Sequence, residues 1–128
     1  MNKTFFSTGV VFGGLAVILG AFAAHTLEKY IGEGSIQTFQ TGVRYQMYHA
    51  LLLLIVAQTN FITAIGKKYI FTFLVTGIVL FSFSIYFLAT NELTSFDFKN
   101  IAFITPLGGV CLILGWILLG IQAVKRFH

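Results

Sequence analysis

Charged residues are scarce in this sequence: they make up 9% of its 128 residues, whereas 57% are hydrophobic. A soluble globular domain usually carries about 25% charged residues, and a chain with so few cannot cover a water-facing surface. The shortage therefore excludes an ordinary soluble domain and favours a protein that lies in lipid. The net charge of +4 does not indicate nucleic-acid binding, because the basic residues are scattered at the ends of apolar runs.

Groups that carry chemistry are scarce as well. Cys111 is the only cysteine, and none of the four acidic residues lies within an apolar run. An intramolecular disulfide is therefore excluded, a zinc site lacks ligands, and neither a carboxylate pair nor a nucleophile with its base can be singled out. We expect no enzyme, no cofactor and no metal centre. The two halves of the chain also lack the internal repeat that is typical of transporters.

Long apolar runs dominate what is present. They cover residues 4–24, 45–65, 69–90 and 101–124, and each reaches the roughly 20 residues that a helix needs to cross about 30 Å of hydrocarbon. The first run is longer than the core of a cleaved secretory signal, so we expect it to remain as a span; the alternative is cleavage at residues 21–23, which resemble a signal-peptidase motif. Short connections make successive helices antiparallel. The sequence therefore predicts one all-α domain, 1–128, that folds as an antiparallel four-helix transmembrane bundle.

Basic residues predict which way this bundle faces. With four spans, the N-terminus, the second connection and the C-terminus share one side. That side carries five basic residues and the other carries three, together with all four acids. Because cytoplasmic connections are enriched in Lys and Arg, we expect a plasma-membrane protein with both termini in the cytoplasm. The five are Lys3, Lys67, Lys68, Lys125 and Arg126, and the three are Lys29, Arg44 and Lys99.

Two segments carry helix signals of their own. From Ser35 to Arg44, apolar residues recur at helical spacing with polar residues between them. This predicts a short interfacial helix that leads into the second span and that Gly42 can bend; an ordinary polar loop fits the spacing less well. Thr105 and Pro106 match the residue before a helix and its first residue. The fourth span therefore starts there, or it is one longer helix kinked at Pro106.

Small residues mark surfaces where membrane helices can approach closely. Because they are frequent in the first and fourth spans, we expect these two spans to form the tightly packed inner pair. The GxxxG spacing in the first span also fits a homo-oligomer, although packing within one chain is the commoner reason for it. The packing candidates are Gly9, Gly13 and Gly20 in the first span and Gly108, Gly109 and Gly115 in the fourth.

Polar residues are predicted to gather at the outer end of the bundle. An ionisable group at the depth of His49 is costly and suggests function, yet a neutral imidazole that bonds another helix is the commoner explanation. A pair with His25 is weak evidence for a metal or haem. Arg44 beside tyrosines is typical of an interfacial anchor and can also serve an anionic headgroup. The candidates for a ligand site or polar network are His25, Arg44, Gln46, Tyr48, His49 and Thr105.

Four motifs occur in order along nearly the whole chain. They are GAFAAHTL at residues 20–27, TGVRYQMYHAL at 41–51, LFSFSIYFLA at 80–89, and ITPLGG followed by GW at 104–116. Together they resemble the signature of the YgdD-like small membrane protein family, a domain of unknown function that includes vertebrate transmembrane protein 256. Ala23 and Phe83 stand where that family has glycine. The resemblance implies a four-span, bacterial-type plasma-membrane protein and supplies no substrate or reaction.

The function predicted from these observations is coarse. We expect a structural, accessory, or small-ligand or lipid-binding role for the outer polar cluster, with the lipid bilayer as the main partner. The alternative is a component of a small channel or proton-coupled transporter that uses His49. The sequence of one chain shows no polar path through the inner half of the bundle, so that alternative requires an oligomer.

Overall fold

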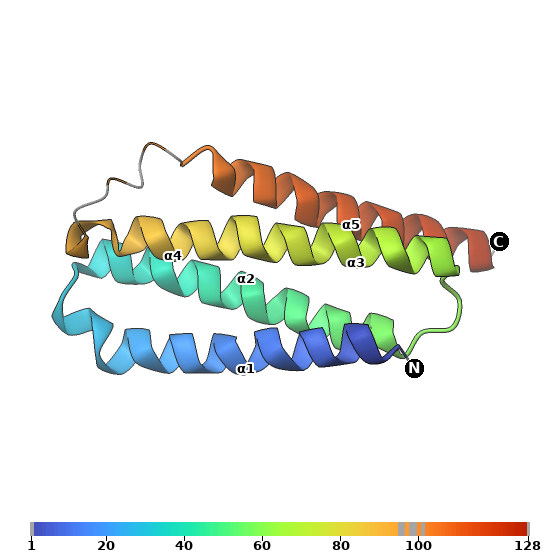
Figure 1. Cartoon of the computed structure of the whole chain (residues 1–128), viewed down its shortest axis with the longest axis horizontal. Coiled ribbons are helices and arrows are strands. Elements are labelled where there is room, and N and C mark those ends of the chain that lie inside the picture. Colours follow the sequence, from blue (N-terminus) through green and yellow to red (C-terminus); the bar gives the residue numbers. More distant parts are fainter. Residues whose placement is uncertain (1, 95–96, 98–99, 101, 128) are drawn as a thin grey trace.

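The computed structural model describes residues 2–94, 97, 100 and 102–127, and every regular element within these ranges is helical (Figure 1). The predicted all-α bundle is thereby confirmed. Its third rod is continuous through a π-helical turn, η2. The elements are α1 (Lys3–His25), η1 (Leu27–Lys29), α2 (Glu33–Ala57), α3 (Ala64–Ile78), η2 (Val79–Phe83), α4 (Ser84–Ala89), η3 (Asn91–Leu93) and α5 (Ile104–Phe127).

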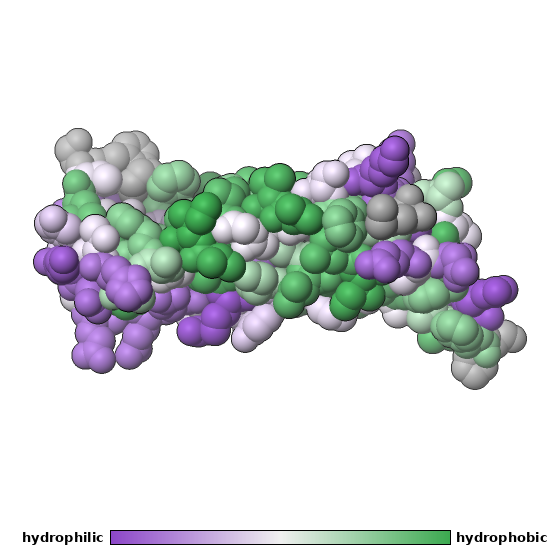
Figure 2. Space-filling model, turned by 90° about the horizontal axis from the view of Figure 1, so that it is seen from below, coloured by the Kyte–Doolittle hydropathy of each residue, from purple (hydrophilic) through white to green (hydrophobic). Residues whose placement is uncertain are grey.

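The apolar runs form rods of membrane length. Within the described residues, three of them are long and apolar enough to cross a bilayer: Lys3–Lys29, Ala64–Ala89 and Ile104–Phe127. The remaining rod, α2, has 25 residues and so a length of about 37 Å. Polar side chains in its first half lower its hydropathy. In Figure 2 an apolar band lies between two polar ends of the molecule, as expected for a protein that spans a bilayer.

The bounds of α2 differ from the predicted second span. The helix begins at Glu33 and ends at Ala57, so the expected interfacial helix is simply its N-terminal part. The apolar run reads on to residue 65, yet polar groups end the helix earlier. The backbone N–H groups of Gln58 and Thr59 bond the carbonyls of Ile55 and Val56, and the N–H of Asn2 bonds the carbonyl of Ala57 at 2.8 Å. These bonds satisfy carbonyls that a helix end leaves open.

The start of α5 also differs slightly from the sequence signal. The helix begins at Ile104, so Thr105 lies inside its first turn rather than before it. Pro106 is in the same turn, where a backbone N–H has no helical partner and its loss costs nothing. Pro106 therefore belongs to the beginning of the helix.

The expected inner pair is wrong. α1 packs along α2, whereas α5 packs against α3 and η2, and α1 and α5 lie on opposite sides of the bundle (Figure 1). Only 17% of the most apolar window of each outer rod is buried, compared with 44% for the α3–α4 rod. Small residues allow close approach to any neighbour, so their frequency in two spans did not identify which helices meet.

Both termini lie at one end of the bundle, on the right in Figure 1, together with the connection between α2 and α3. The opposite end holds the C-terminal end of α1, the start of α2 and the end of α4. It is closed by Leu27 of η1 and Ile31, which are buried in a cluster with Phe39 and Tyr86. We call this the far end. Ala23, one of the two residues that replace a family glycine, is fully buried there.

Candidate functional site

Helix α2 carries polar side chains on two different sides. One set is buried between helices and the other is exposed at the far end. Gln46 is central to the buried set, with no exposed surface. Its amide Nε2 donates to the carbonyl of Phe12 in α1 at 2.8 Å, and its Oε1 accepts from the hydroxyl of Tyr86 in α4 at 2.6 Å. One amide thereby joins three helices in a region where polar groups have no water to bond.

His49 joins a fourth helix to this buried set. The indole Nε1–H of Trp116 in α5 donates to His49 Nε2 at 3.0 Å, and His49 Nδ1 lies 2.7 Å from the carbonyl oxygen of Tyr45. Because an indole N–H can only donate, Nε2 is the acceptor and Nδ1 carries the proton that it gives to Tyr45. The ring is thus a neutral imidazole with both nitrogens bonded. We call Gln46, His49, Tyr86 and Trp116 the buried node; the first three are buried, and Trp116 closes the node from the surface.

Short hydroxyl contacts hold the same helices nearby. Ser82 in η2 donates to the carbonyl of Gly42 at 2.8 Å, and the hydroxyls of Ser84 and Thr105 lie 2.6 Å apart. A Cβ on Gly42 would stand 2.7 Å from the ring of Tyr86, so the glycine is required for this approach rather than for a bend. The predicted candidate Thr105 therefore ties the start of α5 to α4.

Glycines form the other close contacts between helices. Gly9 is pressed against Leu54 and the carbonyl of Ala50, and Gly115 against Leu74. A Cβ on Gly108 would overlap the backbone of Phe81 in η2. Gly13 and Gly20 have more room: a Cβ added to them would lie 3.7 Å from Ala50 and 3.4 Å from Val43, and a Cβ on Gly109 would meet nothing within 4 Å.

The buried node lies deeper than the sequence analysis expected. Its partners Phe12 and Trp116 are near the middle of α1 and α5. The reason is the earlier start of α2, which moves His49 away from the helix end. His25 is not close to it: Gly13 lies opposite Ala50, so His25 is about 18 Å further along α1 at ~1.5 Å per residue. His25 is exposed, and the two histidines do not form one site.

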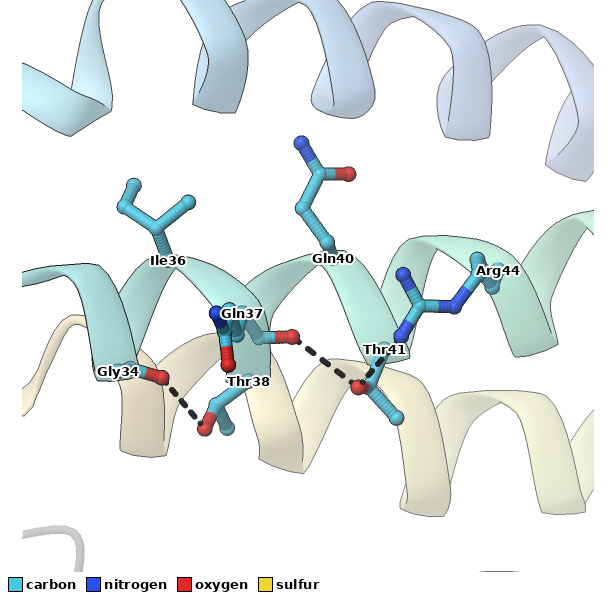
Figure 3. Close-up of a pocket in the computed structure, with 7 residues that line it drawn as sticks. All are labelled: Gly34, Ile36, Gln37, Thr38, Gln40, Thr41 and Arg44. Atoms are coloured by element: carbon cyan, nitrogen blue, oxygen red, sulfur yellow. Dashed lines mark hydrogen bonds between the residues drawn. The ribbon is translucent and has the colours of Figure 1, made fainter.

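The exposed set lines an open groove on the N-terminal part of α2 (Figure 3). The hydroxyls of Thr38 and Thr41 donate to the carbonyls of Gly34 and Gln37 at 3.1 and 3.0 Å. Arg44 Nη2 donates to the Thr41 hydroxyl at 3.0 Å, which directs the guanidinium back along α2 towards the far end (Figure 3). This bond uses one of five guanidinium N–H groups.

Aromatic rings continue this surface towards the middle of α2. Tyr48 is 54% exposed one turn beyond Arg44, and its ring centroid lies 5.7 Å from that of Tyr45. Tyr45 in turn lies 5.0 Å from Phe81. The surface thus changes from polar to aromatic in the direction of the apolar band. We call Gln37, Thr41, Arg44 and Tyr48 the Arg44 face.

Tyr86, Ser82 and Trp116 were not among the predicted site residues. The signal that could have found Tyr86 and Trp116 is the need of Gln46 and His49 for partners at membrane depth, since buried polar atoms are almost always bonded. Ser82 bonds a backbone carbonyl instead, and the other apolar runs contain many further side chains that can donate a hydrogen bond. Which of them meets which acceptor depends on helix order, and that order was predicted wrongly.

Comparisons with known proteins place the chain among bacterial membrane proteins. Residues 19–109 match the family described as "Protein of unknown function (DUF423)". The UPF0382 membrane protein YwdK of Bacillus subtilis is 42% identical over 125 residues, which are 96% of this chain and 98% of YwdK. A UPF0382 membrane protein of Staphylococcus epidermidis is 37% identical over 123 residues, covering 96% and 97% of the two chains. The UPF0382 inner membrane protein YgdD of Escherichia coli is 41% identical over 115 residues, covering 88% and 83%. No solved structure matches.

Proposed function

The chain belongs to the DUF423 family of membrane proteins of unknown function, and we propose that it binds an anionic lipid headgroup on the Arg44 face and catalyses no reaction. The observation that carries the proposal is the state of Arg44. Arg44 is exposed, its guanidinium is held in place by Thr41, and it uses one donor among the described residues. A planar guanidinium can donate to two phosphate oxygens at once. Phosphate is the group that lipids carry at the membrane surface, where we place this end of α2.

The placement of the chain in the membrane is part of the proposal. α2 runs obliquely between the α3–α4 rod at the far end and α1 at the end with the termini (Figure 1), so it crosses the bilayer with them and completes four spans. The end with the termini carries the five basic residues identified above, and it faces the cytoplasm by the positive-inside rule. The far end then faces outward from the plasma membrane. A C-terminal reporter that is active only in the cytoplasm gives a signal if this is correct and none if the bundle is inverted.

The hydrogen bonds of the buried node argue against a transport function. Its hydrogen bonds run sideways, from Gln46 to α1 and α4 and from His49 to α5. Both nitrogens of His49 are engaged, and Gln46 uses its donor and its acceptor. A proton path would instead need exchangeable groups in sequence across the bilayer. The node therefore supports a role in holding the bundle together, and the Arg44 face supports a role in meeting a ligand.

The test is native mass spectrometry of the full chain with added phosphatidylglycerol or phosphatidylcholine. Arg44→Gln should weaken phosphatidylglycerol binding about fivefold to tenfold and weaken phosphatidylcholine binding less, because choline offsets the charge of the phosphate that the guanidinium contacts. Arg126→Gln is the matched control, because it removes the same charge at the opposite end of the bundle, and it should weaken phosphatidylglycerol binding less than Arg44→Gln does. Equal loss of phosphatidylglycerol in both variants, or loss in neither, would overturn the proposal.

A further inference from the structure

A second groove lies between α2 and α5 and is separate from the one that contains Arg44. It has a volume of about 300 Å³. Both helices pack against η2 rather than extensively against each other, which leaves the groove open on the outside of the bundle. Its lining includes Tyr45 and His49 from α2, Phe81 from η2, and Gly109, Leu112 and Trp116 from α5.

Gly109 keeps this groove open. Its neighbour Gly108 has no room for a side chain because Phe81 is pressed against it, but a Cβ on Gly109 would meet nothing within 4 Å. The glycine at 109 is therefore not needed for packing between helices. Since Gly109 lines the groove, a large side chain there, such as leucine, would occupy part of it.

The lining of the groove is suited to hydrocarbon. Its walls are aromatic rings and aliphatic side chains, and Trp116 is 49% exposed. The polar atoms of His49 and Trp116 are already bonded to each other and to the Tyr45 carbonyl. A polar ligand would have to break one of these bonds, whereas a methylene chain makes dispersion contacts without breaking any. The groove therefore favours an apolar chain.

The groove is continuous with the Arg44 face. Tyr48 belongs to that face, and its ring packs against Tyr45, which lines the groove. Going from Arg44 towards the termini, the surface is first polar, then aromatic, and then opens into the groove. This is the order of groups in a phospholipid that stands in a bilayer, with the phosphate outermost and the acyl chains below it.

We propose that one acyl chain of the lipid bound at Arg44 lies in the groove between α2 and α5, against Trp116. This inference rests on the proposed function, and it defines the ligand as a single lipid held at both headgroup and chain. From Gly109 to Trp116 the groove is about 10 Å long at ~1.5 Å per residue, so it holds part of a chain. Filling the groove should weaken binding even when Arg44 is intact.

Trp116 makes the inference measurable because it is the only tryptophan. Its fluorescence is quenched by lipids with brominated chains that contact it. In vesicles, brominated phosphatidylglycerol should quench Trp116 at about a fivefold lower mole fraction than brominated phosphatidylcholine. Gly109→Leu should abolish this preference. Gly120→Leu is the matched control on the same helix, where a Cβ also meets nothing within 4 Å, and it should keep the preference.

The outcomes separate the two proposals. If Arg44→Gln lowers phosphatidylglycerol binding but Gly109→Leu leaves both binding and preferential quenching intact, the headgroup site stands and the chain site is wrong. If Arg44→Gln has no effect on binding, the proposed function itself fails. If Gly109→Leu instead converts a dimer to a monomer in native mass spectra, the groove is the contact site for a second copy of the chain, and the acyl-chain proposal is overturned.

Discussion

The buried node is centred on Gln46 and His49 of α2, and the Arg44 face lies on the same helix. The two regions differ in how their polar atoms are used. In the node, Gln46 donates to α1 and accepts from α4, while His49 accepts from α5 and donates to the Tyr45 carbonyl of its own helix. On the Arg44 face, the described hydrogen bonds stay within α2, and the guanidinium retains donors that can reach outward. Depth alone would rank His49 as the functional residue. The bonding of each group points instead to Arg44.

The difference shows what a polar residue in a membrane helix can mean. Each unsatisfied polar group in hydrocarbon costs several kcal/mol, so a group in the interior either has a partner from another helix or destabilises the fold. A group near the headgroups has no such requirement and can keep donors for a ligand. The buried node should therefore control stability, and the Arg44 face should control lipid binding.

The largest effect on stability is expected at the adjacent glycines Gly108 and Gly109. The first is packed against η2, and the second lines the open groove. Gly108→Ala places a Cβ against the backbone of Phe81 and should lower the free energy of unfolding by about 1–3 kcal/mol, since neither backbone can move freely. Gly109→Ala should leave it unchanged or raise it by up to about 1 kcal/mol, because alanine favours helix and has room. Unfolding in increasing mole fractions of dodecyl sulfate measures both; equal destabilisation would show that the groove is not open.

The next largest effect comes from removing one hydroxyl from the node. Tyr86→Phe keeps the ring and deprives Gln46 Oε1 of its donor, which should cost about 0.6–2 kcal/mol of unfolding free energy. Tyr48→Phe removes the same atom from an exposed ring and should change the free energy by less than about 0.5 kcal/mol. The same unfolding measurement compares them, and a larger effect at Tyr48 would reverse the assignment of the two regions.

A smaller effect is expected at the link between α2 and α5. Trp116→Phe keeps an aromatic ring and removes the N–H that donates to His49. Its cost should be about 0.6 kcal/mol, the average for hydrogen bonds between membrane helices. Phosphatidylglycerol affinity, measured by native mass spectrometry, should stay within about twofold of the wild type because the apolar wall of the groove remains. A loss of lipid binding with unchanged stability would mean that the indole N–H contacts the ligand.

The smallest effect is expected on lipid affinity in Arg44→Lys, which separates the contribution of the guanidinium geometry from that of its charge. Arg44→Lys keeps the positive charge and loses the planar pair of donors. Phosphatidylglycerol binding should fall about twofold to threefold, less than in Arg44→Gln, because charge attraction to anionic lipid persists. Titration in native mass spectra gives the ratio. A lysine variant as weak as the glutamine variant would show that geometry, not charge, dominates.

Part of this account could be predicted from the sequence. Scarce charge and long apolar runs predicted the all-α membrane bundle, and the even number of runs predicted that both termini share an end. The end of α2 was missed because the hydropathy of residues 61–65 masks the polar stop at Gln58 and Thr59, whose N–H groups close the helix. Hydropathy indicates whether a segment lies in lipid or in water. It does not indicate which groups bond the carbonyls at the end of a helix.

The candidate site was predicted as one cluster and is two regions. Gln46 and His49 were grouped with Arg44 because the predicted topology puts all three at the outer end of the bundle. The helical period separates them: Gln46 faces α1 and α4, while Arg44 faces outward. The partners Tyr86 and Trp116 come from distant segments, so finding them required the order of helices around the bundle, which small-residue frequency does not give.

The most direct test of the division between the two regions measures stability and lipid affinity together in two variants, Tyr86→Phe and Arg44→Gln. Unfolding by dodecyl sulfate gives the first quantity, and phosphatidylglycerol titration by native mass spectrometry gives the second. Tyr86→Phe should be less stable and bind phosphatidylglycerol like the wild type, whereas Arg44→Gln should be as stable as the wild type and bind about fivefold to tenfold more weakly. If Tyr86→Phe loses the lipid while Arg44→Gln retains it, the buried node is the binding site and the account is contradicted.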